Sequence, residues 1–160
     1  MAGYSNQKVF ILYEDEHLLV VKKPFGIESQ RGKSFAMDQE SLLRGYLSSK
    51  TKTDNPYLAV VHRLDRPVAG VMVYAKTKKA AADLSAQLQT ENFSKKYEAV
   101  VSGIVPACEG RLEDYLTADK RTGTTSVSSK ADPLAKKAVL TWKEIAREEV
   151  KSGEILLPYA

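Results

Sequence analysis

The stretch with the clearest chemical potential is HRLDR at residues 62–66, inside the longer run LAVVHRLDRPVAGVMVYAKT. It places one carboxylate, that of Asp65, between two guanidinium groups. Opposite charges nearby favour the ionised form of a carboxyl, so Asp65 should be a poor proton donor at neutral pH. It could instead act as a nucleophile or a base. The alternative interpretation is an exposed ion pair in a loop, which is common and contributes about 0–1 kcal/mol.

The position of Asp65 in the sequence favours a functional site over that alternative. Apolar runs at 58–61 and 71–75 predict a buried strand on each side of it. Active-site residues are often found where a loop leaves a rigid sheet. We therefore expect the carboxylate to lie in a sheltered cleft.

The elements around this segment predict a single α+β domain with a mixed, mostly antiparallel central sheet and a few flanking helices. Helical spacing of apolar residues predicts one helix near 37–50, capped by Asp38 or Ser34, and another near 78–89, capped by Thr77. Besides the two strands beside Asp65, further strands are predicted at 9–13, 18–22, 95–103, 110–116, 124–129 and 136–146.

The charge distribution indicates a polyanionic partner. The chain carries a formal net charge of +4, and residues 61–98 hold seven lysines and arginines against four acidic residues. Such a basic region concentrates nucleic acid, although a solvated mixed-charge face is the alternative. The single cysteine and the lack of a secretion signal or a long apolar run lead us to expect a cytoplasmic protein without membrane association.

Three motifs together carry a family resemblance. HRLDRPVAGVMVYAKT closely resembles the signature of the RluA family of pseudouridine synthases, which has His-Arg-Leu-Asp, a glycine, an apolar strand and Ala-Lys-Thr. ILYEDEHLLVVKKPFGI resembles the opening hairpin of that family, and KKYEAVVSG resembles its Lys-x-Tyr strand. Three motifs in the right order over residues 9–147 make the resemblance specific.

The resemblance implies an RNA pseudouridine synthase that isomerises uridine in structured ribosomal or transfer RNA, with Asp65 as the catalytic residue. It implies no metal and no organic cofactor, and we expect a monomer. Arg63 would help to displace the target nucleotide, and Tyr97 would pack against the extruded uracil. His62 is either a hydrogen-bonding neighbour of the site or a half-buried structural histidine. The candidate RNA contacts, each of which could instead serve solubility alone, are Arg66, Lys76, Lys95 and Lys96.

The sequence departs from the family pattern at two points. Val68-Ala69-Gly70 stands where Thr-Ser-Gly is usual. The family's Gly-Arg-x-His-Gln-Ile-Arg segment, whose arginine pairs with the catalytic aspartate, has no counterpart here. We therefore expect one catalytic domain, residues 1–160, incomplete at its C-terminus and without an N-terminal RNA-binding domain. The alternatives to a working enzyme are a non-catalytic RNA-binding remnant or fragment, and a structural domain whose charged loop has no chemical role.

Overall fold

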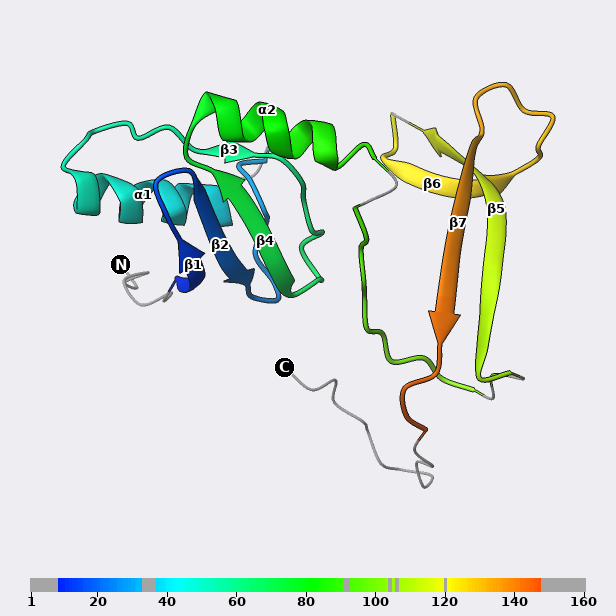
Figure 1. Ribbon diagram of the computed structural model, residues 1–160. Helices are drawn as coiled ribbons and strands as arrows, with labels where there is room; N and C mark the ends of the chain where they lie inside the picture. Colours follow the sequence, from blue (N-terminus) through cyan, green and yellow to red (C-terminus); the bar gives the residue numbers. More distant parts are fainter. Residues whose placement is uncertain are drawn as a thin grey trace. The chain divides into compact units, whose positions relative to one another are not determined.

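The first two strands form the predicted hairpin. β1 (Phe10–Glu14) pairs antiparallel with β2 (Leu18–Lys23), as Figure 1 shows. The turn between them is held by the Asp15 carboxylate, whose Oδ1 accepts the backbone N–H groups of His17 at 2.7 Å and Leu18 at 2.6 Å. A short acidic side chain that binds the backbone two and three residues ahead is a common way to close a turn.

The hairpin belongs to a four-stranded sheet in the order β1-β2-β4-β3. β4 (Gly70–Ala75) pairs antiparallel with β2 on one side and with the short β3 (Ala59–Val60) on the other. The two apolar strands predicted beside Asp65 are therefore real, and they lie next to each other. The segment 61–69 connects them at one end of the sheet.

Both predicted helices are present, and both begin at a predicted cap. α1 (Gln39–Thr51) follows Asp38, and α2 (Lys78–Gln87) follows Thr77. Each cap accepts a hydrogen bond from the backbone N–H three residues ahead, at 2.9 Å and 3.2 Å. The other proposed cap, Ser34, lies outside the described residues. Within the described part of the chain, no helix has the length and apolarity needed to cross a bilayer.

The core of this sheet comes from one face of β2 and β4 and from α1. Alternate residues of β2 face inward, namely Leu19, Val21 and Lys23, and each has no exposed surface. The first two join a cluster with residues from α1, β4 and the approach to β3: Leu43, Leu47, Leu58, Met72 and Tyr74. Unlike Leu19 and Val21, Lys23 carries a charged group, and a buried charge requires polar partners.

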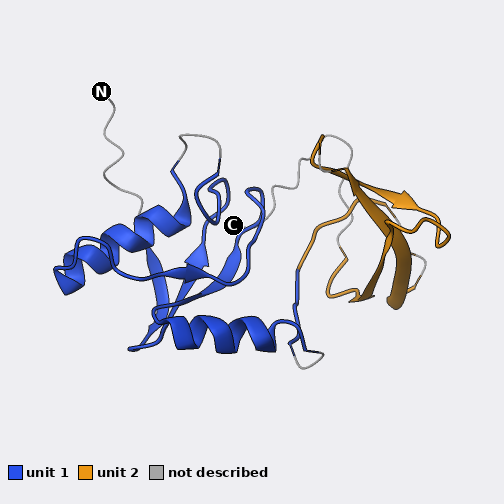
Figure 2. Ribbon diagram, turned by 90° about the horizontal axis from the view of Figure 1, so that it is seen from above, with its two compact units in different colours: residues 1–97, 160 blue, residues 98–159 orange. Residues whose placement is uncertain are grey.

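The structure, a computed structural model, describes residues 9–32, 37–90, 93–103, 105, 107–119 and 121–147. The chain divides into two compact units, which Figure 2 colours separately: residues 1–97 with 160, and residues 98–159. The sheet and helices above belong to the first unit.

The second unit contains a three-stranded antiparallel sheet in the order β6-β5-β7. Its strands are β5 (Glu109–Asp119), β6 (Thr124–Ser128) and β7 (Lys136–Lys143), close to the predicted positions. Leu112 lies opposite Leu140, and both residues are 53% exposed. With both units, the described chain has the predicted α+β composition, and its strands pair antiparallel.

One predicted strand is absent. Residues 93–103 are described but adopt no regular structure, although KKYEAVVSG has the composition of a strand. A strand is defined by pairing with a neighbour, and none of the described strands pairs with this segment. The prediction was wrong here because the composition of a segment does not determine whether a neighbouring strand is available to pair with it.

Candidate active site

The loop between β3 and β4 carries Asp65 at an open position. The Asp65 side chain is exposed, and among the described residues its carboxylate makes no hydrogen bond and no ion pair. The backbone turns there, with the Val68 N–H donating to the Asp65 carbonyl at 3.0 Å. The sheltered position expected from the sequence is not seen within the described unit, because the loop is packed through its backbone and not through this side chain.

The two neighbouring arginines do not pair with Asp65 either. Arg63 is exposed. The Arg66 guanidinium turns to the loop after β2, where its Nε donates to the Gly26 carbonyl at 2.9 Å. Among the described residues, the Asp65 carboxylate is therefore open to contact with a substrate, which both a nucleophile and a base must make.

Lys23 is a candidate site residue that sequence reasoning missed. Its ammonium group is fully buried and donates to the carbonyls of Ile27 at 2.7 Å, Pro24 at 3.1 Å and Arg66 at 3.4 Å. Burial lowers the pKa of Lys23, and the negative charge of Asp65 opposes that shift. The signal in the sequence was a lysine on the inward-facing alternation of an otherwise apolar strand.

Ser29 is a second missed residue. Its side chain is buried, with 4% of the residue exposed. The hydroxyl accepts the Leu64 N–H at 3.0 Å and donates to the Leu64 carbonyl. The sequence offered no signal for this contact, because a serine in a polar loop resembles any solvated serine.

His62 is half-buried and has a defined role in the packing of the loop. Its Nε2 accepts the Val73 backbone N–H at 3.0 Å, which assigns the proton of the neutral ring to Nδ1. Burial lowers the pKa of His62, and the positive charge of Lys95 lowers it further. The structure thus brings Lys95 close enough to influence the loop, and it ties His62 to β4.

The remaining predicted residues are not gathered around Asp65. Tyr97 is 64% exposed and Lys96 is also exposed, in the segment without regular structure. No hydrogen bond joins Tyr97 to Asp65 among the described residues. The described geometry therefore brings together the loop residues 62–66 and the segment 23–29, while the proposed uracil-stacking role of Tyr97 stays a prediction.

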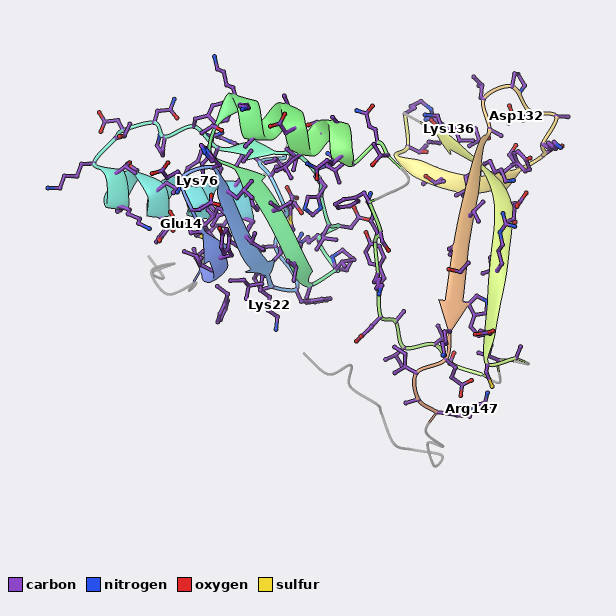
Figure 3. All side chains as sticks on the ribbon, viewed as in Figure 1. Glu14, Lys22, Lys76, Asp132, Lys136 and Arg147 are labelled. Carbon is purple, nitrogen blue, oxygen red and sulfur yellow. The ribbon has the colours of Figure 1, made fainter. Side chains whose placement is uncertain are left out.

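Lys76 belongs to an ion-pair network with Glu14. Its Nζ lies 2.7 Å from Glu14 Oε1 and also donates to the Asp15 carbonyl, and its side chain is only 18% exposed (Figure 3). The other carboxylate oxygen of Glu14 accepts from Lys50 at 2.9 Å and from Tyr46 at 2.8 Å. A phosphate contact by Lys76 would have to compete with these bonds.

This network predicts a pH-dependent loss of stability. Burial alone would raise the pKa of Glu14, but the hydrogen bonds from Lys76, Lys50 and Tyr46 outweigh it and lower the pKa to about 2. A carboxyl with a lowered pKa in the folded state stabilises the fold above its ordinary pKa of 4.5, and that stabilisation is lost as the pH falls towards 2. We expect Glu14→Gln to lower the free energy of unfolding at pH 7 by about 1–2 kcal/mol, since solvent screens the half-exposed Lys50.

Urea unfolding at pH 7 and near pH 2 checks this expectation. The difference between Glu14→Gln and the wild type should shrink at the lower pH, where the Glu14 carboxyl is protonated in the unfolded protein and about half protonated in the folded one. The exposed neighbour Glu16 supplies the matched control, Glu16→Gln, which should show little difference at either pH. An equal loss for Glu14→Gln at both pH values would contradict an electrostatic origin.

No group of three or more histidine, cysteine, aspartate or glutamate side chains suited to a metal ion occurs among the residues that the structure describes. The candidate site consists of the 62–66 loop and the segment 23–29 that binds the loop backbone.

The fold is that of pseudouridine synthase domains. The solved structure of Human RNA Pseudouridylate Synthase Domain Containing 4 superimposes with a TM-score of 0.65 at 24% identity, covering 81% of this chain and 51% of that one. Human RNA Pseudouridylate Synthase Domain Containing 1 gives a TM-score of 0.66 at 19% identity, covering 88% of this chain and 54% of that one. At these identities the likeness concerns the fold alone.

Sequence comparison identifies the family. The family model described as RNA pseudouridylate synthase matches residues 17–156, and the chain belongs to that family. The RluA-type resemblance is confirmed by a Dual-specificity RNA pseudouridine synthase RluA of Vibrio vulnificus, which is 38% identical over 109 residues, or 68% of this chain and 41% of the relative.

Other relatives carry names that specify different RNAs. Ribosomal large subunit pseudouridine synthase D of Pseudomonas aeruginosa is 41% identical over 96 residues, or 59% of this chain and 29% of the relative. tRNA pseudouridine synthase C of Yersinia pestis is 31% identical over 140 residues, or 88% of this chain and 52% of the relative. The chain thus spans about half or less of the length of these relatives.

Proposed function

We propose that this chain carries the catalytic part of an RNA pseudouridine synthase and that Asp65 is its catalytic residue. The observation that carries the proposal is the place of Asp65, on the loop between β3 and β4, with the backbone fixed on both sides of it. Family membership supplies the reaction class. Names of relatives that specify ribosomal and transfer RNA support a structured RNA of one of these kinds as the substrate.

The proposed reaction converts uridine to pseudouridine within the RNA chain. The bond between N1 of uracil and C1′ of the ribose breaks, and a bond between C5 and C1′ forms. The hydrogen on C5 leaves as a proton, and N1 takes up a proton, so atoms and charge balance. The Asp65 carboxylate is proposed to serve this reaction either as a nucleophile or as a base.

The neighbouring cationic and aromatic groups suit an extruded nucleotide. A base inside a stack is out of reach, and extruding it costs a few kcal/mol. Arg63 is exposed beside Asp65 and is proposed to occupy the space that the base leaves. Tyr97 presents an exposed ring, and stacking of a base on such a ring contributes about 1–3 kcal/mol. Lys95, Lys96 and Arg66 are proposed to contact the RNA backbone.

The test uses the full chain and RNA labelled with tritium at C5 of uridine. Ribosomal RNA and transfer RNA are incubated separately with the protein, and release of tritium into water is measured together with RNA binding. Release from either RNA is the expected result. RNA binding without release would favour the alternative of an RNA-binding fragment, and neither binding nor release would contradict the proposal altogether.

A further inference from the structure

The backbone is fixed on both sides of Asp65, and both attachments come from one short segment, residues 23–29. On the N-terminal side, the Ser29 hydroxyl binds the N–H and the carbonyl of Leu64. On the C-terminal side, the Arg66 carbonyl accepts the Gly26 N–H at 2.9 Å. Asp65 itself lies between these two anchored residues.

The Ser29 attachment is connected to the core of the sheet. The Ser29 carbonyl accepts the Tyr74 hydroxyl at 3.1 Å, and Tyr74 is fully buried on β4. A buried hydroxyl costs free energy unless its hydrogen-bonding capacity is used, and here one hydroxyl serves both polar groups of a single residue. A continuous set of hydrogen bonds therefore runs from β4 through Ser29 to Leu64, the residue directly before Asp65.

The second attachment, at Arg66, is also made by residues of the segment 23–29. Lys23 Nζ binds the carbonyls of Pro24 and Ile27 within its own segment and reaches the Arg66 carbonyl at 3.4 Å. The Arg66 side chain returns a bond to the Gly26 carbonyl. Gly26 has a φ of +88°, a conformation that favours glycine, so the turn that presents these groups depends on that residue.

We propose that Ser29 is a positioning residue for Asp65, assisted on the opposite side of the loop by Lys23. The proposal rests on the proposed function for its catalytic consequence. The Asp65 carboxylate has no hydrogen bond or ion pair among the described residues, so its place is set mainly through the backbone that carries it. A displacement of about 1 Å in a reacting group can lower a rate about 100-fold, so greater mobility of the Leu64 backbone should lower the rate of the reaction.

The first measurement separates the rate of reaction from RNA binding. We expect Ser29→Ala to lower the single-turnover rate of tritium release at saturating RNA by about 10- to 100-fold, with RNA affinity unchanged. Ser29→Thr retains a hydroxyl and should recover most of the rate. Ser49→Ala is the matched control, because the exposed Ser49 hydroxyl donates to the Gly45 carbonyl within α1, away from the 62–66 loop. An unchanged rate in Ser29→Ala, or a loss confined to affinity, would overturn the proposal.

The second measurement does not depend on turnover. Amide hydrogen exchange followed by NMR should show the Leu64 N–H exchanging at least about tenfold faster in Ser29→Ala, because its acceptor is gone, while the N–H of Leu43 in α1 is unchanged. Equal exchange at Leu64 in both proteins would overturn the positioning role. If the wild type releases no tritium, the proposed function fails, and the exchange result still decides the role of Ser29.

A third variant covers the case in which the alanine protein does not fold. Ser29→Cys keeps nearly the same shape but supplies only a weak donor and acceptor. It should fold, and its Leu64 N–H should exchange faster than in the wild type but more slowly than in Ser29→Ala. Wild-type exchange at Leu64 in a folded Ser29→Cys protein would count against the proposal as directly as the alanine result.

Discussion

Asp65→Asn is expected to abolish measurable tritium release from RNA labelled at C5 of uridine. The amide has the size of the carboxylate but can act neither as a base nor as an anionic nucleophile. Loss of a base alone costs about 10²- to 10⁴-fold in rate, and loss of a covalent nucleophile removes the pathway. Among the described residues the carboxylate has no bond to lose, so the fold and the RNA affinity should be retained.

The matched control is Asp54→Asn, which makes the same chemical change at another exposed loop aspartate of the same unit. Tritium release, RNA binding and circular dichroism are compared for the three proteins. Release by Asp65→Asn at the rate of the Asp54 variant would remove Asp65 from the catalytic role. Loss of RNA binding by Asp65→Asn would instead indicate a structural role for the carboxylate.

Leu43→Ala should produce a large loss of stability. Leu43 has no exposed surface and belongs to the cluster that joins α1 to β2 and β4. Truncating a leucine at such a position removes buried apolar surface and leaves a cavity, which costs about 2–5 kcal/mol in the free energy of unfolding. That is a large share of the stability of a domain of this size.

Urea unfolding followed by far-ultraviolet circular dichroism measures this loss. Leu12→Ala is the control, because Leu12 lies in the same unit but is 57% exposed, and surface substitutions usually change stability by less than about 0.5 kcal/mol. Similar midpoints for the two variants would show that the described core is not the source of stability. Trp142, the single tryptophan, lies in the second unit, so its fluorescence reports the unfolding of that unit separately.

Much of the fold could be predicted because the relevant signals are local. Asp38 and Thr77 cap helices through bonds to backbone groups three residues away, and such bonds are encoded by neighbouring residues. The first hairpin is likewise specified by two apolar runs and the turn at Asp15. The strand predicted over residues 95–103 failed for the complementary reason, since pairing depends on distant segments.

The candidate site was likewise predictable only where its signals are local in the sequence. The spacing within residues 62–66 and the flanking apolar runs singled out Asp65, and this segment together with two further motifs suggested the family, which the comparisons established. The sequence also suggested that Lys76 could contact RNA, but it gave no sign that Glu14, more than sixty residues away, binds its ammonium group. Charge in a sequence states what a side chain can do, while its partners are fixed only by folding.

By itself, the sequence determined the local elements around the candidate site and the resemblance that indicates the reaction, and it singled out Asp65 as the proposed reacting group. Only the tertiary structure decided how that group is held. Ser29 and Leu64 lie 35 positions apart, and Lys23 and Arg66 lie 43 apart, yet these pairs anchor the backbone on either side of Asp65. The physical reason is that a buried polar group must find a partner wherever the packed chain supplies one, and sequence distance carries no information about that place.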